Sequence, residues 1–201
     1  MELKTLTHNL IVDKALANHP FEQATCWCVF TGAPCAGKTT LLESLSQHGF
    51  KWYPEIARVY VEQKLSDWEN LQTIRAEEGK FQRGLIDAKV ALELNADPTE
   101  TILFDRAMPD SITYYRVAGL DPREVLSKCF HRRYAKVFIL DPLPFIADNA
   151  RTEDEGIVAF LDFWLECDYR ALGYDVVRVP VMSISERTQL VLAHIRGLPT
   201  R

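Results

Sequence analysis

The strongest constraint on the fold lies in residues 31–40, TGAPCAGKTT, which fit the pattern GxxxxGK[ST]. Gly32 and Gly37 tolerate positive φ, so the N–H groups between them can turn inward onto phosphate oxygens. Lys38 is expected to reach the β- and γ-phosphates, and the Thr39 hydroxyl to ligate Mg²⁺. The predicted nucleotide-binding residues are Gly32, Ala33, Pro34, Cys35, Ala36, Gly37, Lys38, Thr39 and Thr40.

The flanks of this loop have the structure that a phosphate loop needs. Residues 26–30 (CWCVF) form a short apolar run typical of a buried strand. Residues 39–45 (TTLLESL) carry leucines at helical spacing. A strand, a glycine loop and a helix in this order predict an α/β fold with an anion at the helix N-terminus.

Composition and charge restrict the number of domains, the kinds of partner and the location of the protein. The chain has 201 residues, 47% hydrophobic and 25% charged, which suits one globular domain. A net charge of −5 argues against a nucleic-acid partner, because such proteins usually present a basic face. No run is apolar enough for a transmembrane segment or signal peptide, so we expect a cytoplasmic location. The five cysteines form no CxxC pair and are expected to be reduced.

Glu55 is the first candidate outside the loop. Residues 50–53 (FKWY) read as a second strand ended by Pro54, and Glu55 follows at once. Ligands of open α/β sheets gather beyond the carboxyl ends of the strands, so Glu55 is a candidate catalytic base or substrate ligand. A solvated glutamate at a helix start, stabilised by the helix dipole, explains the position equally well.

The long segment after Glu55 has a helical pattern over residues 56–96. It exceeds what one crossover between neighbouring strands needs, so part of it is expected to cap an acceptor site. Arg58, Gln82 and Arg83 are polar candidates there, although a solvated helix face also accounts for each of them.

Residues 101–105 (TILFD) predict a buried strand that ends in Asp105 and is followed by Arg106. A carboxylate at this position in a phosphate-loop protein can hold Mg²⁺ or orient the Thr39 hydroxyl, and the arginine can reach phosphate. The predicted metal residues are therefore Thr39 and Asp105.

The last third of the chain predicts two more strands, over residues 136–140 and 173–180, and a closing helix over residues 185–195. The basic run at residues 131–134 is typical of a solvated turn. Residues 143–155 are polar and proline-broken, as in a lid. Arg151 within them is a candidate arginine finger, or else an i,i+4 ion-pair partner of Glu155.

Together these elements predict a three-layer phosphate-loop NTPase fold. It has about five parallel strands, helices on both faces and a lid. We expect an N-terminal arm over residues 1–24 and the phosphate-loop domain over residues 25–201.

The sequence also resembles the AAA-like ATPase domain family, which takes in nicotinamide-riboside-kinase-type modules. The resemblance is carried by these segments: residues 54–58 (PEIAR), 105–106 (DR), 109–111 (PDS), 114–115 (YY), 140–144 (LDPLP), 151–154 (RTED), 172–174 (LGY), 179–180 (VP) and 186–187 (ER). The resemblance implies that the domain over residues 25–201 has a fold of the nucleoside and nucleotide kinase kind. It also implies Mg²⁺-dependent ATP or GTP binding and adds Arg187 to the nucleotide-binding residues. One relative is a GTP- and phosphoinositide-binding trafficking domain, which keeps a phosphoinositide or protein partner open.

Two functions of different classes fit these residues. In a small-molecule kinase, Lys38, Glu55, Asp105, Arg106 and Arg151 act on a nucleoside triphosphate and a small hydroxylated or phosphorylated acceptor. In a nucleotide-switched binding protein, the γ-phosphate orders the lid and no acceptor is needed. The chain lacks the Asn-Lys-x-Asp signature that GTPases use for guanine, which favours ATP over GTP.

Overall fold

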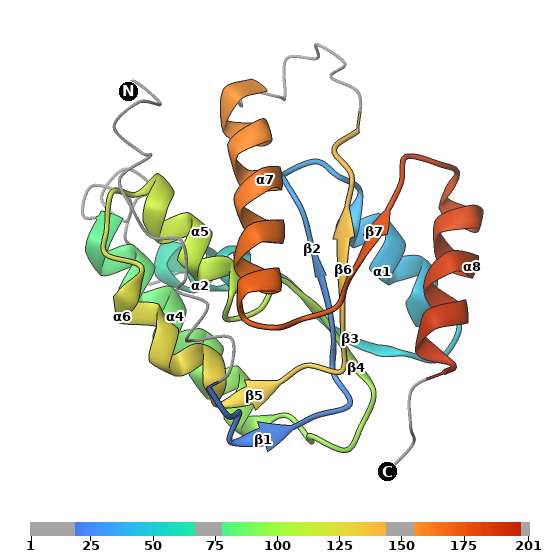
Figure 1. Cartoon of the computed structure of the whole chain (residues 1–201), viewed down its shortest axis with the longest axis horizontal. Helices are drawn as coiled ribbons and strands as arrows, with labels where there is room; N and C mark the ends of the chain where they lie inside the picture. Colours follow the sequence, from blue (N-terminus) through green and yellow to red (C-terminus); the bar gives the residue numbers. More distant parts are fainter. Residues whose placement is uncertain (1–18, 67–77, 144–154, 198–201) are drawn as a thin grey trace.

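The main sheet of the computed structural model contains five parallel strands (Figure 1). The structure describes residues 19–66, 78–143 and 155–197. The strands lie in the order β3–β4–β2–β6–β7, and the loop strand β2 is central. Their bounds are Lys51–Tyr53 (β3), Ile102–Asp105 (β4), Cys28–Thr31 (β2), Lys136–Leu140 (β6) and Val176–Val179 (β7).

Helices cover both faces of this sheet, as the continuous apolar strands require. Cys28 and Phe30 of β2 pack with the helices α1 and α8, whereas Val29 packs on the opposite face in the larger cluster. Figure 1 shows α1 and α8 on one side of the sheet and α4, α5 and α7 on the other. The helices are Lys38–Ser46 (α1), Ile56–Ser66 (α2), Glu78–Asn95 (α4), Asp110–Val117 (α5), Arg123–Leu126 (α6), Glu155–Ala171 (α7) and Ile184–Ile195 (α8). The predicted α/β layers are thus confirmed.

The sheet topology brings distant parts of the sequence to one edge. β4 pairs with both β2 and β3, so the carboxyl ends of these three strands are neighbours. The loop begins at the end of β2, Glu55 follows β3, and Asp105 ends β4. The candidate residues therefore meet beyond the carboxyl edge of the sheet.

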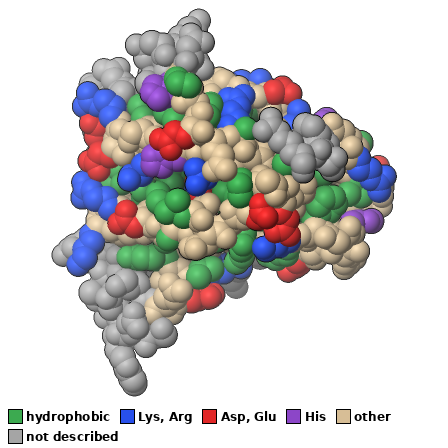
Figure 2. Space-filling view, turned by 90° about the horizontal axis from the view of Figure 1, so that it is seen from below, with side chains coloured by type: hydrophobic (Ala, Val, Ile, Leu, Met, Phe, Trp, Pro, Cys, Tyr) green, Lys and Arg blue, Asp and Glu red, His purple; other side chains and the backbone are tan. Residues whose placement is uncertain are grey.

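A second, two-stranded sheet corrects our expectation for residues 131–134. β1 (Gln23–Ala24) pairs in parallel with β5 (Arg132–Arg133), so the basic run is a strand and not a turn. The guanidinium of Arg133 lies 4.7 Å from the ring centre of Phe21 and 4.6 Å from that of Tyr174, which stabilises this strand by cation–π contacts. Figure 2, which views the molecule from below, shows basic and acidic side chains interspersed on this face.

Some expectations concern residues outside the described ranges. They include most of the arm and nearly all of the predicted lid, with Arg151. Within the described residues, no helix has the length and apolarity needed to cross a membrane.

Candidate active site

The phosphate loop has the backbone shape that its glycines predict. Gly32 has φ 135°, and a Cβ there would lie 2.6 Å from the carbonyl oxygen of Leu140, so no larger residue fits. Gly37 has φ 85° and precedes α1 directly. Cys35, an exposed residue at the loop apex, takes φ 58°, which is uncommon for a residue with a side chain. The loop is therefore held in a strained conformation that suits close approach of an anion.

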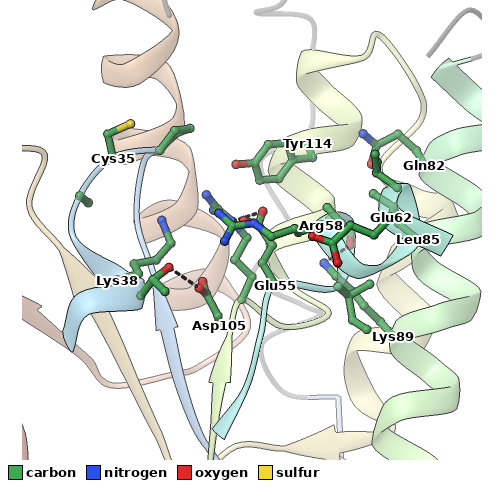
Figure 3. A pocket seen from close by; sticks show the side chains of 18 of the residues that line it. Cys35, Lys38, Glu55, Arg58, Glu62, Gln82, Leu85, Lys89, Asp105 and Tyr114 are labelled. Atoms are coloured by element: carbon green, nitrogen blue, oxygen red, sulfur yellow. Dashed lines mark hydrogen bonds and ion pairs between the residues drawn. The ribbon is translucent and has the colours of Figure 1, made fainter. Parts of the chain in front are cut away.

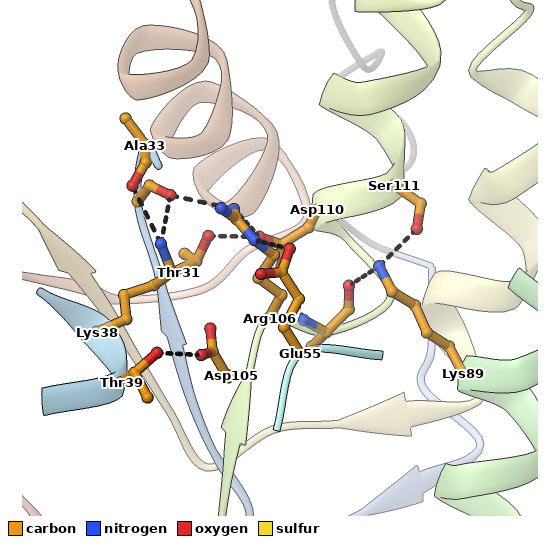
Figure 4. Close-up of polar contacts among 12 residues, drawn as sticks. Thr31, Ala33, Lys38, Thr39, Glu55, Lys89, Asp105, Arg106, Asp110 and Ser111 are labelled. Carbon is orange, nitrogen blue, oxygen red and sulfur yellow. Dashed lines mark hydrogen bonds and ion pairs between the residues drawn. The ribbon is translucent and has the colours of Figure 1, made fainter. Parts of the chain in front are cut away.

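Lys38 folds back across its own loop (Figure 4). Its Nζ donates to the carbonyl oxygens of Ala33 at 3.0 Å and Gly32 at 3.3 Å. Burial, helped by the nearby charge of Arg106, lowers the pKa of Lys38 to about 8. Within the described residues, the hydrogen bonds of this ammonium go to carbonyl oxygens, and a buried ammonium so placed has a strong electrostatic preference for an incoming phosphate.

Thr39 and Asp105 present oxygen atoms suited to a divalent cation. The Thr39 hydroxyl donates to Oδ2 of Asp105 at 3.5 Å, and Oδ1 of Asp105 is buried with no hydrogen-bond partner in the part of the chain that the structure describes. Burial raises the pKa of Asp105 to about 6. Hard oxygen donors beside a phosphate site fit Mg²⁺, which keeps water and phosphate oxygens as its other ligands. The described residues contain no cluster of three or more His, Cys, Asp or Glu that could hold a metal unaided.

Glu55 and Arg106 form an ion pair that the sequence did not show. Nε of Arg106 donates to Oε1 of Glu55 at 2.8 Å, and Nη1 donates to the carbonyl oxygen of Gly32 at 3.0 Å. Arg106 has φ 67°, so its backbone is strained to hold this position. Although burial raises the pKa of Glu55, the charges of Arg106 and Lys38 outweigh it and lower that pKa below its ordinary value. Glu55 is thus held ionised beside the loop.

Asp110 joins three elements around this pair, a role our sequence analysis missed. Its carboxylate is fully buried and accepts hydrogen bonds from the Thr31 hydroxyl, from the Ala107 N–H at 2.8 Å and from the Tyr169 hydroxyl at 2.6 Å. It also lies 3.6 Å from Nη1 of Arg106. Only its place at a helix start was visible in the sequence, because its partners lie on β2 and α7.

Lys89 is a second functional candidate that the sequence analysis missed. Its Nζ donates to the carbonyl oxygen of Ala107 and to Oγ of Ser111, both at 2.8 Å. Burial lowers its pKa. The only sequence signal was a lysine four residues after Leu85 on the apolar face of a helix.

One cavity of about 1060 Å³ is lined by the loop residues 34–40, Glu55, Lys89, Asp105 and Arg106, but not by Asp110. Its first part, here called the phosphate lobe, is formed by residues 34–40 and Asp105. Its second part, the acceptor lobe, is formed by lining residues of α2, α4 and α5. Figure 3 shows Glu55 and Tyr114 between Lys38 on one side and Arg58, Gln82 and Lys89 on the other. The acceptor-lobe lining is Ile56, Ala57, Arg58, Val61, Glu62, Glu78, Phe81, Gln82, Leu85, Lys89, Ser111 and Tyr114.

The acceptor lobe combines an apolar wall with a few polar groups. Phe81 and Leu85 of α4 pack with residues of α2 to form the wall. Nε2 of Gln82 donates to Glu78 at 2.8 Å. Of the predicted cap residues, Arg58 and Gln82 line the cavity, whereas Arg83 pairs with Glu124 at 3.1 Å. The cap helices thus form the wall of a pocket suited to a small amphipathic molecule.

Arg187 lies behind the loop and is not among the residues that line the cavity. Its side chain donates from Nη1 to the carbonyl oxygen of Ala36 at 2.7 Å and from Nε to that of Pro180 at 2.9 Å. The residue is 3% exposed. The structure therefore brings together residues 34–40, Glu55, Asp105 and Arg106 in one cavity, whereas Gly32 and Ala33 of the predicted set are not among its lining residues. Arg187 contacts the loop through the Ala36 carbonyl oxygen.

Known proteins share this fold at low sequence identity. Thymidylate kinase from Ehrlichia chaffeensis superposes with a TM-score of 0.62 at 13% identity, over 87% of this chain and 100% of that one. Deoxyadenosine kinase from M. mycoides with bound dATP superposes with a TM-score of 0.58 at 14% identity, over 85% of this chain and 100% of that one. The NadR protein in complex with NR gives 0.59 at 15%, over 87% of this chain and 52% of that one.

A search of the curated proteins found no match. The family described as AAA domain matches residues 27–187, which spans the loop, the cavity and Arg187. This match covers most of the chain and agrees with the phosphate-loop kinase fold seen in the structure. The chain therefore belongs to the AAA domain family.

Proposed function

We propose that this protein is a Mg²⁺-dependent kinase that transfers the γ-phosphoryl group of ATP to a hydroxyl group of a small acceptor. The observation that carries the proposal is the continuity of the cavity. It joins a phosphate lobe, with Lys38, Thr39 and Asp105, to an acceptor lobe, with Glu55 at the junction. A site that only binds and hydrolyses a nucleotide has no need of the second lobe.

The phosphate lobe supplies charge where it develops during transfer. Lys38 would leave the two carbonyl oxygens that it now contacts and bind the β- and γ-phosphates. Thr39 and Asp105 would hold Mg²⁺, which offsets the charge of the phosphate oxygens when bound. The proposal keeps Arg151 as an arginine finger of the lid.

The junction favours a hydroxyl acceptor over a phosphate acceptor. Arg106 already donates to Glu55 and to the Gly32 carbonyl, so its charge is largely compensated. An ionised Glu55 would repel the phosphate of a monophosphate acceptor, but it can accept a hydrogen bond and then the proton of a hydroxyl. Its lowered pKa makes it a weak base, so we expect a contribution near the low end of the usual range.

The acceptor lobe fits a nucleoside-like molecule. A flat apolar body can lie along Phe81 and Leu85, and the amide of Gln82 can pair with a polar edge. Two of the solved neighbours are described as a deoxyadenosine kinase and as a protein bound to NR, both found here at low identity. They support the class of acceptor and not its identity.

The decisive experiment incubates the purified protein with Mg²⁺, labelled ATP or GTP and a panel of nucleosides, sugars and nucleoside monophosphates. We expect label on a nucleoside hydroxyl, with ATP as the better donor. Transfer to monophosphates alone would remove the hydroxyl assignment. Tight triphosphate binding with slow release of inorganic phosphate, and no labelled acceptor from the panel, would favour the nucleotide-switched binding protein.

A further inference from the structure

Arg187 has a buried guanidinium that pairs with no carboxylate of the described residues. No ion pair of Arg187 occurs within the described residues, and its Nη2 is buried with no hydrogen-bond partner. Among the described residues, Asp141 is the acid whose charge acts on Arg187, and Asp141 is already paired with Arg178. Burying such a charge is unfavourable unless an anion compensates it.

The contact of Arg187 with the loop fixes the orientation of the Ala36–Gly37 peptide. A trans peptide is planar, so its carbonyl and N–H groups point in opposite directions, and the described residues contain no cis peptide. Nη1 of Arg187 donates to the Ala36 carbonyl oxygen at 2.7 Å, so the N–H of Gly37 points away from Arg187. No hydrogen bond within the described residues uses the Gly37 N–H.

The fit between Arg187 and the loop is close. A Cβ on Gly37 would lie 3.1 Å from Nη1, so a side chain at position 37 would press on the guanidinium. Nε of Arg187 is fixed at the same time by the Pro180 carbonyl oxygen at 2.9 Å, just before α8. The guanidinium is therefore held against the back of the loop.

We propose that Arg187 is a positioning residue that acts on the polyphosphate through the Ala36–Gly37 peptide, without touching the nucleotide. The guanidinium polarises the Ala36 carbonyl and so strengthens the Gly37 N–H as a donor to phosphate, as in other chains of hydrogen bonds. It also fixes the orientation of this peptide before the ligand arrives. The inference rests on the proposed triphosphate binding and replaces direct nucleotide contact as the role of Arg187.

The experiment measures the affinity of the whole chain for Mg²⁺–ATP and for Mg²⁺–tripolyphosphate, which has no base, by calorimetry. The variants are Arg187→Met, which removes the charge, and Arg187→Lys, which keeps it. Thr188→Ala is the matched control, because Thr188 on the same helix bonds Ser44 of α1 at 2.9 Å and makes no contact with the loop carbonyl. Unfolding midpoints are recorded for all proteins without ligand.

We expect Arg187→Met to lower the affinity for both ligands about 10- to 100-fold, the usual effect of losing a charged hydrogen bond. Arg187→Lys should retain most of the affinity, and Thr188→Ala should bind as the unmodified protein does, even if its unfolding midpoint falls. If Arg187→Met does not fold, the lysine variant and an Arg187→Gln variant carry the comparison, with the glutamine variant expected to bind more weakly than the lysine variant.

Unchanged affinity in Arg187→Met would overturn the inference. Equal losses of affinity in Arg187→Lys and in the neutral variants, Arg187→Met or Arg187→Gln, would also overturn it, since the charge at position 187 would then be irrelevant. A loss for ATP but none for tripolyphosphate would indicate contact with the base or sugar. Absence of binding in the unmodified protein is a separate result, which would remove the proposed function itself.

Discussion

The phosphate lobe and the acceptor lobe share one cavity but are built in different ways. The phosphate lobe comes almost entirely from one stretch, residues 34–40, within a loop whose backbone includes two glycines with positive φ. The acceptor lobe takes side chains from three helices, α2, α4 and α5. Under the proposed function, the first lobe would bind a chemical group common to many substrates, whereas the second would bind a particular molecule.

This difference predicts that substitutions in the two lobes should have different effects on triphosphate affinity. Changes in the phosphate lobe should weaken every triphosphate alike, and changes in the acceptor lobe should leave triphosphate affinity intact. A variant that breaks this division would show that the two lobes are coupled.

Lys38→Ala should have the largest effect. Removing the ammonium should lower phosphoryl transfer about 10³-fold, as does loss of a central charge-stabilising donor. Calorimetry should show weaker Mg²⁺–ATP binding as well. Lys51→Ala is the control, because Lys51 is an exposed lysine paired with Glu100. Unchanged ATP affinity in Lys38→Ala would contradict the assignment of the loop.

Glu55→Gln should lower transfer about 10²-fold, near the low end for a general base because its pKa is already lowered. Mg²⁺–ATP affinity should stay nearly constant, since Glu55 lies at the junction of the lobes. Glu100→Gln serves as the exposed control. Equal transfer rates in the Glu55→Gln and unmodified proteins would exclude Glu55 as the base and favour the switch.

Asp105→Asn should lose Mg²⁺-dependent activity and yet stabilise the protein. Burial raises the Asp105 pKa from 3.8 to about 6, so its charged form destabilises the fold at pH 7 and this cost disappears as pH falls towards 4. A shift of this size corresponds to about 1–3 kcal/mol. Urea unfolding at pH 7 should therefore give a higher free energy of unfolding for Asp105→Asn than for the unmodified protein. At pH 4 the two free energies should be equal. A less stable variant at pH 7 would contradict the burial argument.

The same shift predicts the pH dependence of binding. Below about pH 6, Asp105 takes up a proton and loses its ability to ligate Mg²⁺. The Mg²⁺-dependent part of ATP affinity should fall as pH drops from 7 to 5, and titration calorimetry at both values measures it. If the Mg²⁺-dependent part of ATP affinity were the same at pH 7 and pH 5, Asp105 would not be the metal ligand.

Arg58→Ala should have the smallest effect. Arg58 is exposed and lines the acceptor lobe, so its loss should raise the KM for the acceptor about tenfold and leave ATP affinity unchanged. Arg83→Ala, on α4 and paired with Glu124 outside the cavity, is the matched control. Equal effects of both substitutions would mean that Arg58 is only a surface residue.

Much of the fold could be predicted from the sequence because its signals are local. Residues 101–105 are apolar and end in a carboxylate, and the structure has β4 over Ile102–Asp105. The strand predicted over residues 136–140 is β6, Lys136–Leu140. The β1–β5 pair was missed because two-residue strands carry no periodicity, and because the cation–π contacts of Arg133 involve rings far away in the chain.

The sequence by itself determined the phosphate lobe. Its glycines, lysine and threonine are neighbours in the chain, so their spacing alone fixes the backbone shape and the chemistry. The same holds for Asp105, because a short apolar run that ends in an acid is visible within five residues, and the structure buries every residue of that strand.

Only the tertiary structure decided how the remaining groups meet. Arg106 pairs with Glu55 across 51 residues, Thr31 with Asp110 across 79, and Arg187 with the Ala36 carbonyl across 151. Such contacts follow from strand order and helix packing, which leave no period in the sequence. A charged side chain looks the same in the sequence whether it faces solvent, a substrate or the back of a loop, and its burial and partners alone distinguish these cases.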